Sequence, residues 1–82
     1  MESAVTAQQV EQTIVEAIAS LGHDRSVITR DATFDALDID SLDVVEIAQV
    51  VEEEFGVEVK GEDAKNLESV GDAIDLVVAR LP

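Results

Sequence analysis

Three stretches of this chain carry aliphatic residues at spacings of three and four, and this periodicity is the feature that most limits its fold. In the clearest stretch, residues 41–55, the apolar positions form one stripe that ends at Gly56. Such a stripe has to be buried against other elements, and a chain of 82 residues holds one small core. We therefore expect an all-α bundle in a single domain, residues 1–82. The stripe consists of Val44, Ile47, Ala48, Val51 and Phe55.

Two further helices are predicted, one near each end of the chain. The first begins at Ser3 or Thr6 and stops at Gly22. The last follows an N-cap at Ser69. Their apolar stripes are Val10, Ile14, Ala17, Ile18 and Leu21 in the first helix, and Val70, Ala73, Ile74, Val77 and Val78 in the last.

The segments between these helices show no lasting period. Residues 23–40 are rich in Ser, Thr and Asp and predict a long loop, which is uncommon in a small domain unless it is functional. Residues 57–60 alternate apolar and charged side chains, but no second strand is available to pair with them, so we expect an extended connector. Residues 62–67 predict one or two helical turns. The expected fold is a bundle of three main amphipathic helices and one short helix, whose long first loop is pinned by Val27, Ile28, Phe34 and Leu37.

The charge of the chain excludes several classes of ligand. Nineteen acidic residues against five basic ones give a net charge of −14. Binding to nucleic acid or to an anionic membrane needs a basic surface, so neither is expected. The sequence has no cysteine, which removes disulfides and thiolate chemistry. It has neither a signal-peptide pattern nor an apolar run long enough to span a membrane, and we expect a cytoplasmic monomer.

The chemistry-bearing residues cluster at 38–43, where three aspartates surround Ser41. A nucleophilic serine needs a neighbouring base, but the only histidine, His23, lies in the long loop, and there is no G-x-S-x-G turn. A calcium-binding loop starting at Asp38 fails as well, because Asp43 stands where glycine is required and Gln49 where glutamate is required. We therefore expect neither a catalytic residue nor a metal ligand.

Helix capping is the simplest interpretation of these aspartates. Asp40 suits the N-cap of the helix over 41–55, and Asp43 suits its third position, near the positive end of the dipole. Capping does not explain Leu42 and Val45, which lie off the buried stripe and flank Ser41. An exposed apolar pair beside a helix N-terminus, ringed by acids, indicates a docking site.

The motif Asp40-Ser41-Leu42-Asp43 and the helix after it resemble the discrete acyl carrier proteins. The segments "DATF" before the motif and "EEEFGVEV" and "NLESVGDAIDLV" after it resemble that family in order and spacing. In the family, a separate transferase moves 4'-phosphopantetheine from coenzyme A to the serine of this motif. The resemblance therefore implies an acyl-carrier four-helix bundle, a covalent 4'-phosphopantetheine on Ser41, and a non-catalytic carrier that holds acyl intermediates as thioesters.

The resemblance also implies partners and the surface that they read. A phosphopantetheinyl transferase loads such a carrier, and acyltransferase, ketosynthase and other synthase enzymes with basic docking surfaces then use it. Between Asp35 and Asp63 there are eleven acidic residues, and the only base is Lys60. The alternative is an acidic face that is merely solvated. The residues expected to contact partners are Asp40, Leu42, Asp43, Val45, Glu46, Glu52 and Glu53.

Members of the family shelter the thioester-bound chain between their helices. A core made almost wholly of Val, Ile, Leu and Ala suits such a cleft, although the same residues also suit an ordinary core. The candidate lining residues are Val45, Ile47, Ala48, Val59, Ala64 and Leu67.

The chain departs from the family pattern at several positions. Asp38 stands where many members have glycine, Gln49 stands where an apolar residue is common, and Lys60-Gly61 replaces a usual proline. Fatty-acid biosynthesis is the expected pathway, with a dedicated polyketide or nonribosomal-peptide carrier as the alternative. In a different class, the chain is a non-carrier acidic helical interaction domain in which Ser41 belongs to a cap or is phosphorylated.

Overall fold

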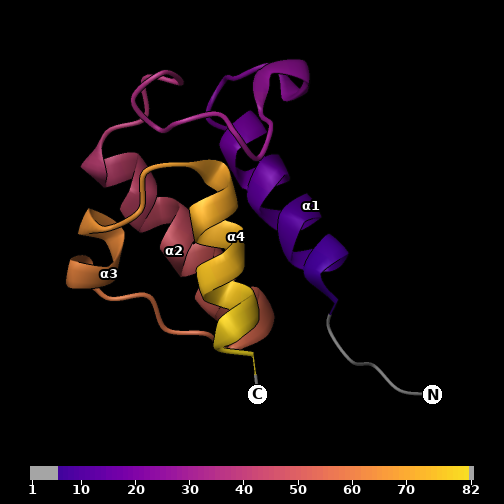
Figure 1. Ribbon diagram of the computed structural model, residues 1–82, viewed down its shortest axis with the longest axis vertical. Helices are drawn as coiled ribbons and strands as arrows, with labels where there is room; N and C mark the ends of the chain where they lie inside the picture. Colours follow the sequence, from indigo (N-terminus) through magenta and orange to yellow (C-terminus); the bar gives the residue numbers. More distant parts are fainter. Residues whose placement is uncertain (1–5, 82) are drawn as a thin grey trace.

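The computed structural model describes residues 6–81, and within them it is helical with no strand. In chain order the elements are α1 (Ala7–Ala19), a short 3₁₀ helix η1 (Arg25–Val27), α2 (Ser41–Phe55), α3 (Gly61–Lys65) and α4 (Val70–Ala79) (Figure 1). The predicted all-α bundle, with three main helices, one short helix and a long first loop, is confirmed.

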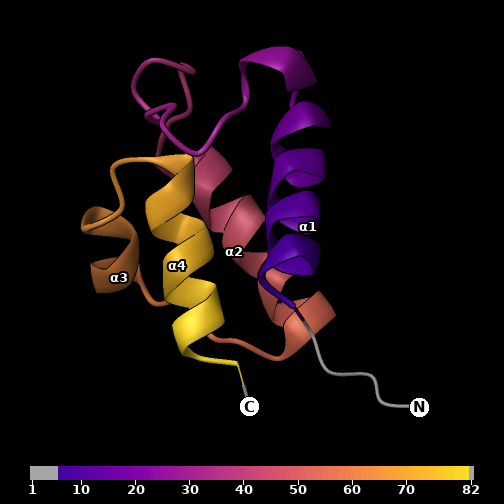
Figure 2. The same cartoon turned by 45° about the vertical axis from the view of Figure 1, so that its right-hand side comes forward.

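The three long helices pack around one aliphatic core. Helix α1 contacts both α4 and α2, whereas α3 contacts α2. Figures 1 and 2 show α3 at the edge of the bundle, on the far side of α4 from α1. Because a five-residue helix has little stability of its own, α3 depends on these tertiary contacts. The fully buried side chains at the centre are Val10, Ile14, Ile18, Val51, Val57, Val70, Ile74 and Val77.

The helix starts follow the capping signals in the sequence. Thr6 caps α1 in a reciprocal pair with Gln9, in which each side chain accepts the other residue's N–H, at 3.2 and 2.9 Å. The alternative start at Ser3 lies outside the described residues. Ser69 caps α4, and its hydroxyl accepts the N–H of Asp72 at 3.1 Å. The predicted N-cap of the last helix is therefore confirmed.

The first helix ends earlier than its apolar pattern predicts. Helix α1 stops at Ala19, and the chain then tightens into i→i−3 bonds, from the N–H of Leu21 to Ile18 and from the N–H of Gly22 to Ala19, both 3.0 Å. Leu21 still packs on the core from this turn. The apolar spacing continues past the end of α1 because the turn packs Leu21 against the same core as the helix.

Two details of the connecting segments were predicted wrongly. Val27 does not pin the long loop, since it is 52% exposed on η1; Ile39, which is 8% exposed, is buried instead. The short helix covers Gly61–Lys65 rather than 62–67, and Leu67 follows it as a partly buried loop residue. The connector at 57–60 has no regular secondary structure, as expected, and Val57 within it is buried.

Candidate functional site: the N-terminus of α2

The long loop is fastened to the start of α4, and this contact fixes where α2 begins. The N–H of Phe34 donates to Glu68 at 3.0 Å, and the N–H of Val70 donates to Ala32 at 2.9 Å. These two bonds flank an isolated antiparallel bridge between Thr33 and Ser69. The loop before α2 is therefore held by backbone pairing to a distant part of the chain.

A Schellman motif then turns the chain into α2. After a single helical turn, the N–H of Ile39 donates to the carbonyl of Phe34 at 2.9 Å, and the N–H of Asp38 donates to Asp35 at 3.0 Å. Asp38 lies between these bonds with φ = 61°, in the left-handed region that favours glycine. Phe34 and Ile39 are both buried, which supplies the apolar contact typical of the motif. Aspartate therefore adopts here a backbone conformation that glycine would adopt with less strain.

Ser41 is the first residue of α2 and lies exposed at its positive end. The Asp40 carboxylate accepts the N–H of Asp43 at 3.0 Å, which confirms the predicted cap. Among residues 6–81 the Ser41 hydroxyl has no hydrogen-bond partner, and the N–H groups of Ser41 and Leu42 have no acceptor. The site therefore offers a free hydroxyl beside two unpaired N–H donors.

Apolar side chains stand out of the surface on both sides of this hydroxyl. Leu42 is 73% exposed and Val45 is 50% exposed, as their position off the buried stripe predicted. Behind them Ile47 and Val51 are buried and hold α2 against the core.

Other kinds of site find little support in the described part of the chain. Residues 6–81 contain no group of three or more His, Cys, Asp or Glu side chains placed to hold a metal ion. Nor is any helix in this range long and apolar enough to cross a membrane.

Comparison with known proteins identifies the family of the chain. Residues 12–77 match the protein family described as "Phosphopantetheine attachment site". The chain belongs to this family. Its structure is also similar to the solution structure of the acetyl actinorhodin acyl carrier protein from Streptomyces coelicolor, with a TM-score of 0.71 and 25% sequence identity over 98% of this chain and 94% of that one. Membership of the acyl carrier family, inferred from the motif, is confirmed, and with it the attachment of 4'-phosphopantetheine. Domains of this type carry intermediates and are themselves non-catalytic.

The residues at the start of α2 fit a phosphopantetheine arm. Attachment needs an accessible hydroxyl; the Ser41 hydroxyl is exposed, and no residue in the described range 6–81 bonds to it. The phosphodiester is an anion, which the unpaired N–H groups of Ser41 and Leu42 and the helix dipole favour. Asp40 and Asp43 would oppose this anion by like charge, and the contribution that the structure shows for Asp40 is the helix cap.

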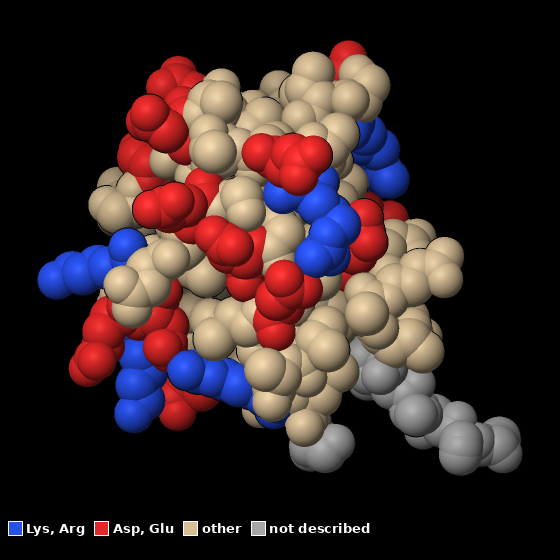
Figure 3. All heavy atoms as spheres, viewed as in Figure 1, with Lys and Arg blue, Asp and Glu red and all other residues tan. Residues whose placement is uncertain are grey.

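The residues expected to contact partners lie on α2 and its cap. Apart from the half-buried Asp43, they are all exposed. Figure 3 shows acidic side chains gathered over the first loop and the beginning of α2, at the upper left of the view. The structure therefore places an acidic surface around an exposed apolar pair.

The residues expected to line an acyl cleft are distributed over two hollows. The outer groove lies between α2 and α3 and has a volume of about 270 Å³. The inner cavity, lined by apolar side chains from α1, the first loop, α2, α4 and the segments on either side of α3, holds only about 20 Å³, room for roughly one water molecule. Val45 and Ala64 line the outer groove, Ile47 and Leu67 line the inner cavity, and Ala48 and Val59 line both.

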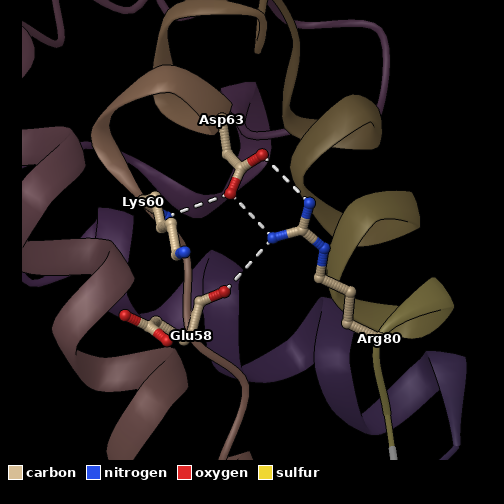
Figure 4. Close-up of polar contacts among 4 residues, drawn as sticks. All are labelled: Glu58, Lys60, Asp63 and Arg80. Atoms are coloured by element: carbon tan, nitrogen blue, oxygen red, sulfur yellow. Dashed lines mark hydrogen bonds and ion pairs between the residues drawn. The ribbon is translucent and has the colours of Figure 1, made fainter.

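Sequence reasoning missed the polar contacts that hold α3. Arg80, just after α4, forms a bidentate contact with Asp63 of α3, at 2.7 and 3.0 Å, and donates to the carbonyl of Glu58 at 3.3 Å (Figure 4). Asp63 also accepts the N–H of Lys60 at 3.1 Å. The hydrogen bond from Arg80, and secondly that from Lys60, lowers the pKa of Asp63 below its ordinary value of 3.8. No local sequence signal marks this contact, since Arg80 is 17 residues from Asp63.

Proposed function

We propose that Ser41 is the attachment residue and that the chain carries acyl intermediates as thioesters. The observation that supports this most strongly is the exposed Ser41 hydroxyl at the first position of α2, which lies within the residues that match the family and has no hydrogen-bond partner in the described part of the chain. The hydroxyl needs no local base, because a separate transferase supplies the catalysis. When attached, the arm provides the thiol that this cysteine-free chain lacks. The chain itself anchors the arm, presents it away from the core and is read by other enzymes.

The surface around Ser41 suits recognition by basic enzymes. Leu42 and Val45 offer an apolar contact, and Asp43, Glu46 and Glu52 place negative charge around it. Electrostatic complementarity of this kind mainly raises association rates, and it is screened beyond about 8 Å at physiological salt. Fast, salt-sensitive complexes suit a carrier that visits a phosphopantetheinyl transferase, an acyltransferase and a ketosynthase in turn.

The outer groove supplies the first place for the acyl chain. It begins at Val45, one turn along α2 from Ser41, and its floor includes Ala48, Val59 and Ala64. Gln49, Glu52 and Lys60 add a polar rim. A chain that enters this groove would remove apolar surface from water, and each methylene buried contributes about 0.8 kcal/mol.

Two classes of cargo are proposed for the chain. The strongly acidic α2 and the aliphatic groove support a role in fatty-acid biosynthesis. The likeness to the actinorhodin acyl carrier protein supports a dedicated polyketide carrier. Intact mass of the protein purified from its own cells, before and after release of the cargo by hydroxylamine, identifies the acyl group and decides between them.

The attachment is tested by loading the purified protein. Incubation with coenzyme A, magnesium and a broad-specificity phosphopantetheinyl transferase should add one phosphopantetheinyl mass. Ser41→Ala should gain nothing, while Ser26→Ala, which removes another exposed hydroxyl, should load like the wild type. Loading of Ser41→Ala would refute the assignment. Absence of loading in the folded wild type would favour the non-carrier interaction domain.

A further inference from the structure

The contacts of Arg80 converge on the segment that carries Val59. Its guanidinium binds the carbonyl of Glu58 and the carboxylate of Asp63, and that carboxylate in turn holds the N–H of Lys60 (Figure 4). The residues on both sides of Val59 are therefore tied through one guanidinium to the end of α4. Asp63 keeps 21% of its side chain exposed and Arg80 keeps 41%, so the contact lies at the surface of the bundle.

Val59 forms part of the wall between the outer groove and the inner cavity. Val44, Ala48 and Val59 line both hollows, with the first two on α2 and Val59 facing them from the connector. An acyl chain that passes from the groove into the core has to separate Val59 from α2. The inner cavity has room for roughly one water molecule, so deeper insertion also requires the surrounding elements to move. Displacement of the connector or of α3 would stretch the bonds that Arg80 makes.

We propose that Arg80 is a positioning residue that holds the Val59 segment and α3 in place, and so limits how far an acyl chain passes from the outer groove into the inner cavity. This inference rests on the proposed function for its cargo, but the restraint on α3 exists in the unloaded protein. Arg80 touches neither hollow, and its effect is exerted through Glu58, Lys60 and Asp63.

The restraint on α3 is tested by amide hydrogen exchange in the unloaded protein. Arg80→Gln is compared with the control Arg30→Gln. The control also removes an exposed arginine–aspartate pair, between Arg30 and Asp75 at 2.9 Å, but this pair lies outside α3. Because the lost pair is exposed, we expect the α3 amides of Arg80→Gln to exchange only about twofold to fivefold faster than those of the wild type. Unchanged exchange there, or equal acceleration in α1, would overturn the proposal. The reporting amides are Ala64, Asn66 and Leu67, whose N–H groups donate to Lys60, Asp63 and Ala64.

The limit on the cargo is tested with a series of acyl chains loaded on Ser41 from acyl-coenzyme A. In the wild type and in Arg30→Gln, the gain in Tm over the free-thiol form should level off at one chain length. In Arg80→Gln it should go on rising and level off at a longer chain. The same plateau in all three proteins would overturn the proposal. If Ser41 does not load, the proposed function fails, while the exchange experiment still decides whether Arg80 restrains α3.

Discussion

Replacement of Asp38 by glycine tests the backbone that delivers Ser41 to the start of α2. Asp38 has φ = 61° at the left-handed position of the Schellman motif. A side chain there costs about 1–2 kcal/mol, with aspartate at the lower end. Glycine also gains freedom in the unfolded chain, worth about 0.4–1 kcal/mol in the opposite direction. We therefore expect Asp38→Gly to raise the free energy of unfolding by about 0.5 kcal/mol.

The matched control is Asp35→Gly. Asp35 lies three residues earlier in the same turn, is exposed like Asp38 and has a negative φ. Both variants lose one carboxylate and gain the same chain entropy, but only Asp38→Gly relieves left-handed strain. Their unfolding free energies in urea should differ by about 1 kcal/mol, roughly 4–8 °C in Tm for a domain of this size. Equal stabilities would show that the turn at Asp38 is unstrained and would refute this reasoning.

The remaining predictions concern packing, pH and recognition. Gly71→Ala should destabilise the fold by about 1 kcal/mol in urea unfolding, because the added Cβ would lie 3.0 Å from a backbone oxygen of the first loop; a more stable variant would contradict this. The advantage of the wild type over Arg80→Gln should persist above pH ~4 and disappear as acid protonates Asp63, because folding lowers the pKa of that carboxyl; an undiminished difference in thermal unfolding at pH ~2.5 would contradict it. Glu46→Lys should slow loading by the transferase at low salt and leave Tm unchanged. Glu54→Lys, on the same helix but outside the expected partner set, is the control. Equal loading rates for the two variants would contradict recognition through the acidic surface.

Local signals in the sequence were sufficient for the three long helices, although they left the start of the first helix open between Ser3 and Thr6 and misplaced the short one. Thr6, Asp40 and Ser69 each precede an apolar stripe, and each is an N-cap in the structure. Leu42 and Val45 were correctly predicted to be exposed, because a helix has one buried face and they lie off it.

What escaped prediction depends on contacts between distant residues. Val27 and Ile28 are both aliphatic and β-branched, but the path of the loop leaves the first exposed and the second buried. The contact from Arg80 to Asp63 joins the end of α4 to α3, and no periodicity reports such a pair. The sequence shows aspartate at position 38, where the resemblance predicts glycine, but only the φ angle shows that this residue lies in the left-handed region.

Peptide mapping of the loaded protein tests the central claim most directly. After modification, proteolysis and tandem mass spectrometry should place the whole phosphopantetheinyl group on the peptide containing Ser41, with fragment ions that confine it to that hydroxyl. A group found on any other residue, or a folded protein that stays unmodified with every competent transferase, would contradict the assignment of Ser41 as the anchor.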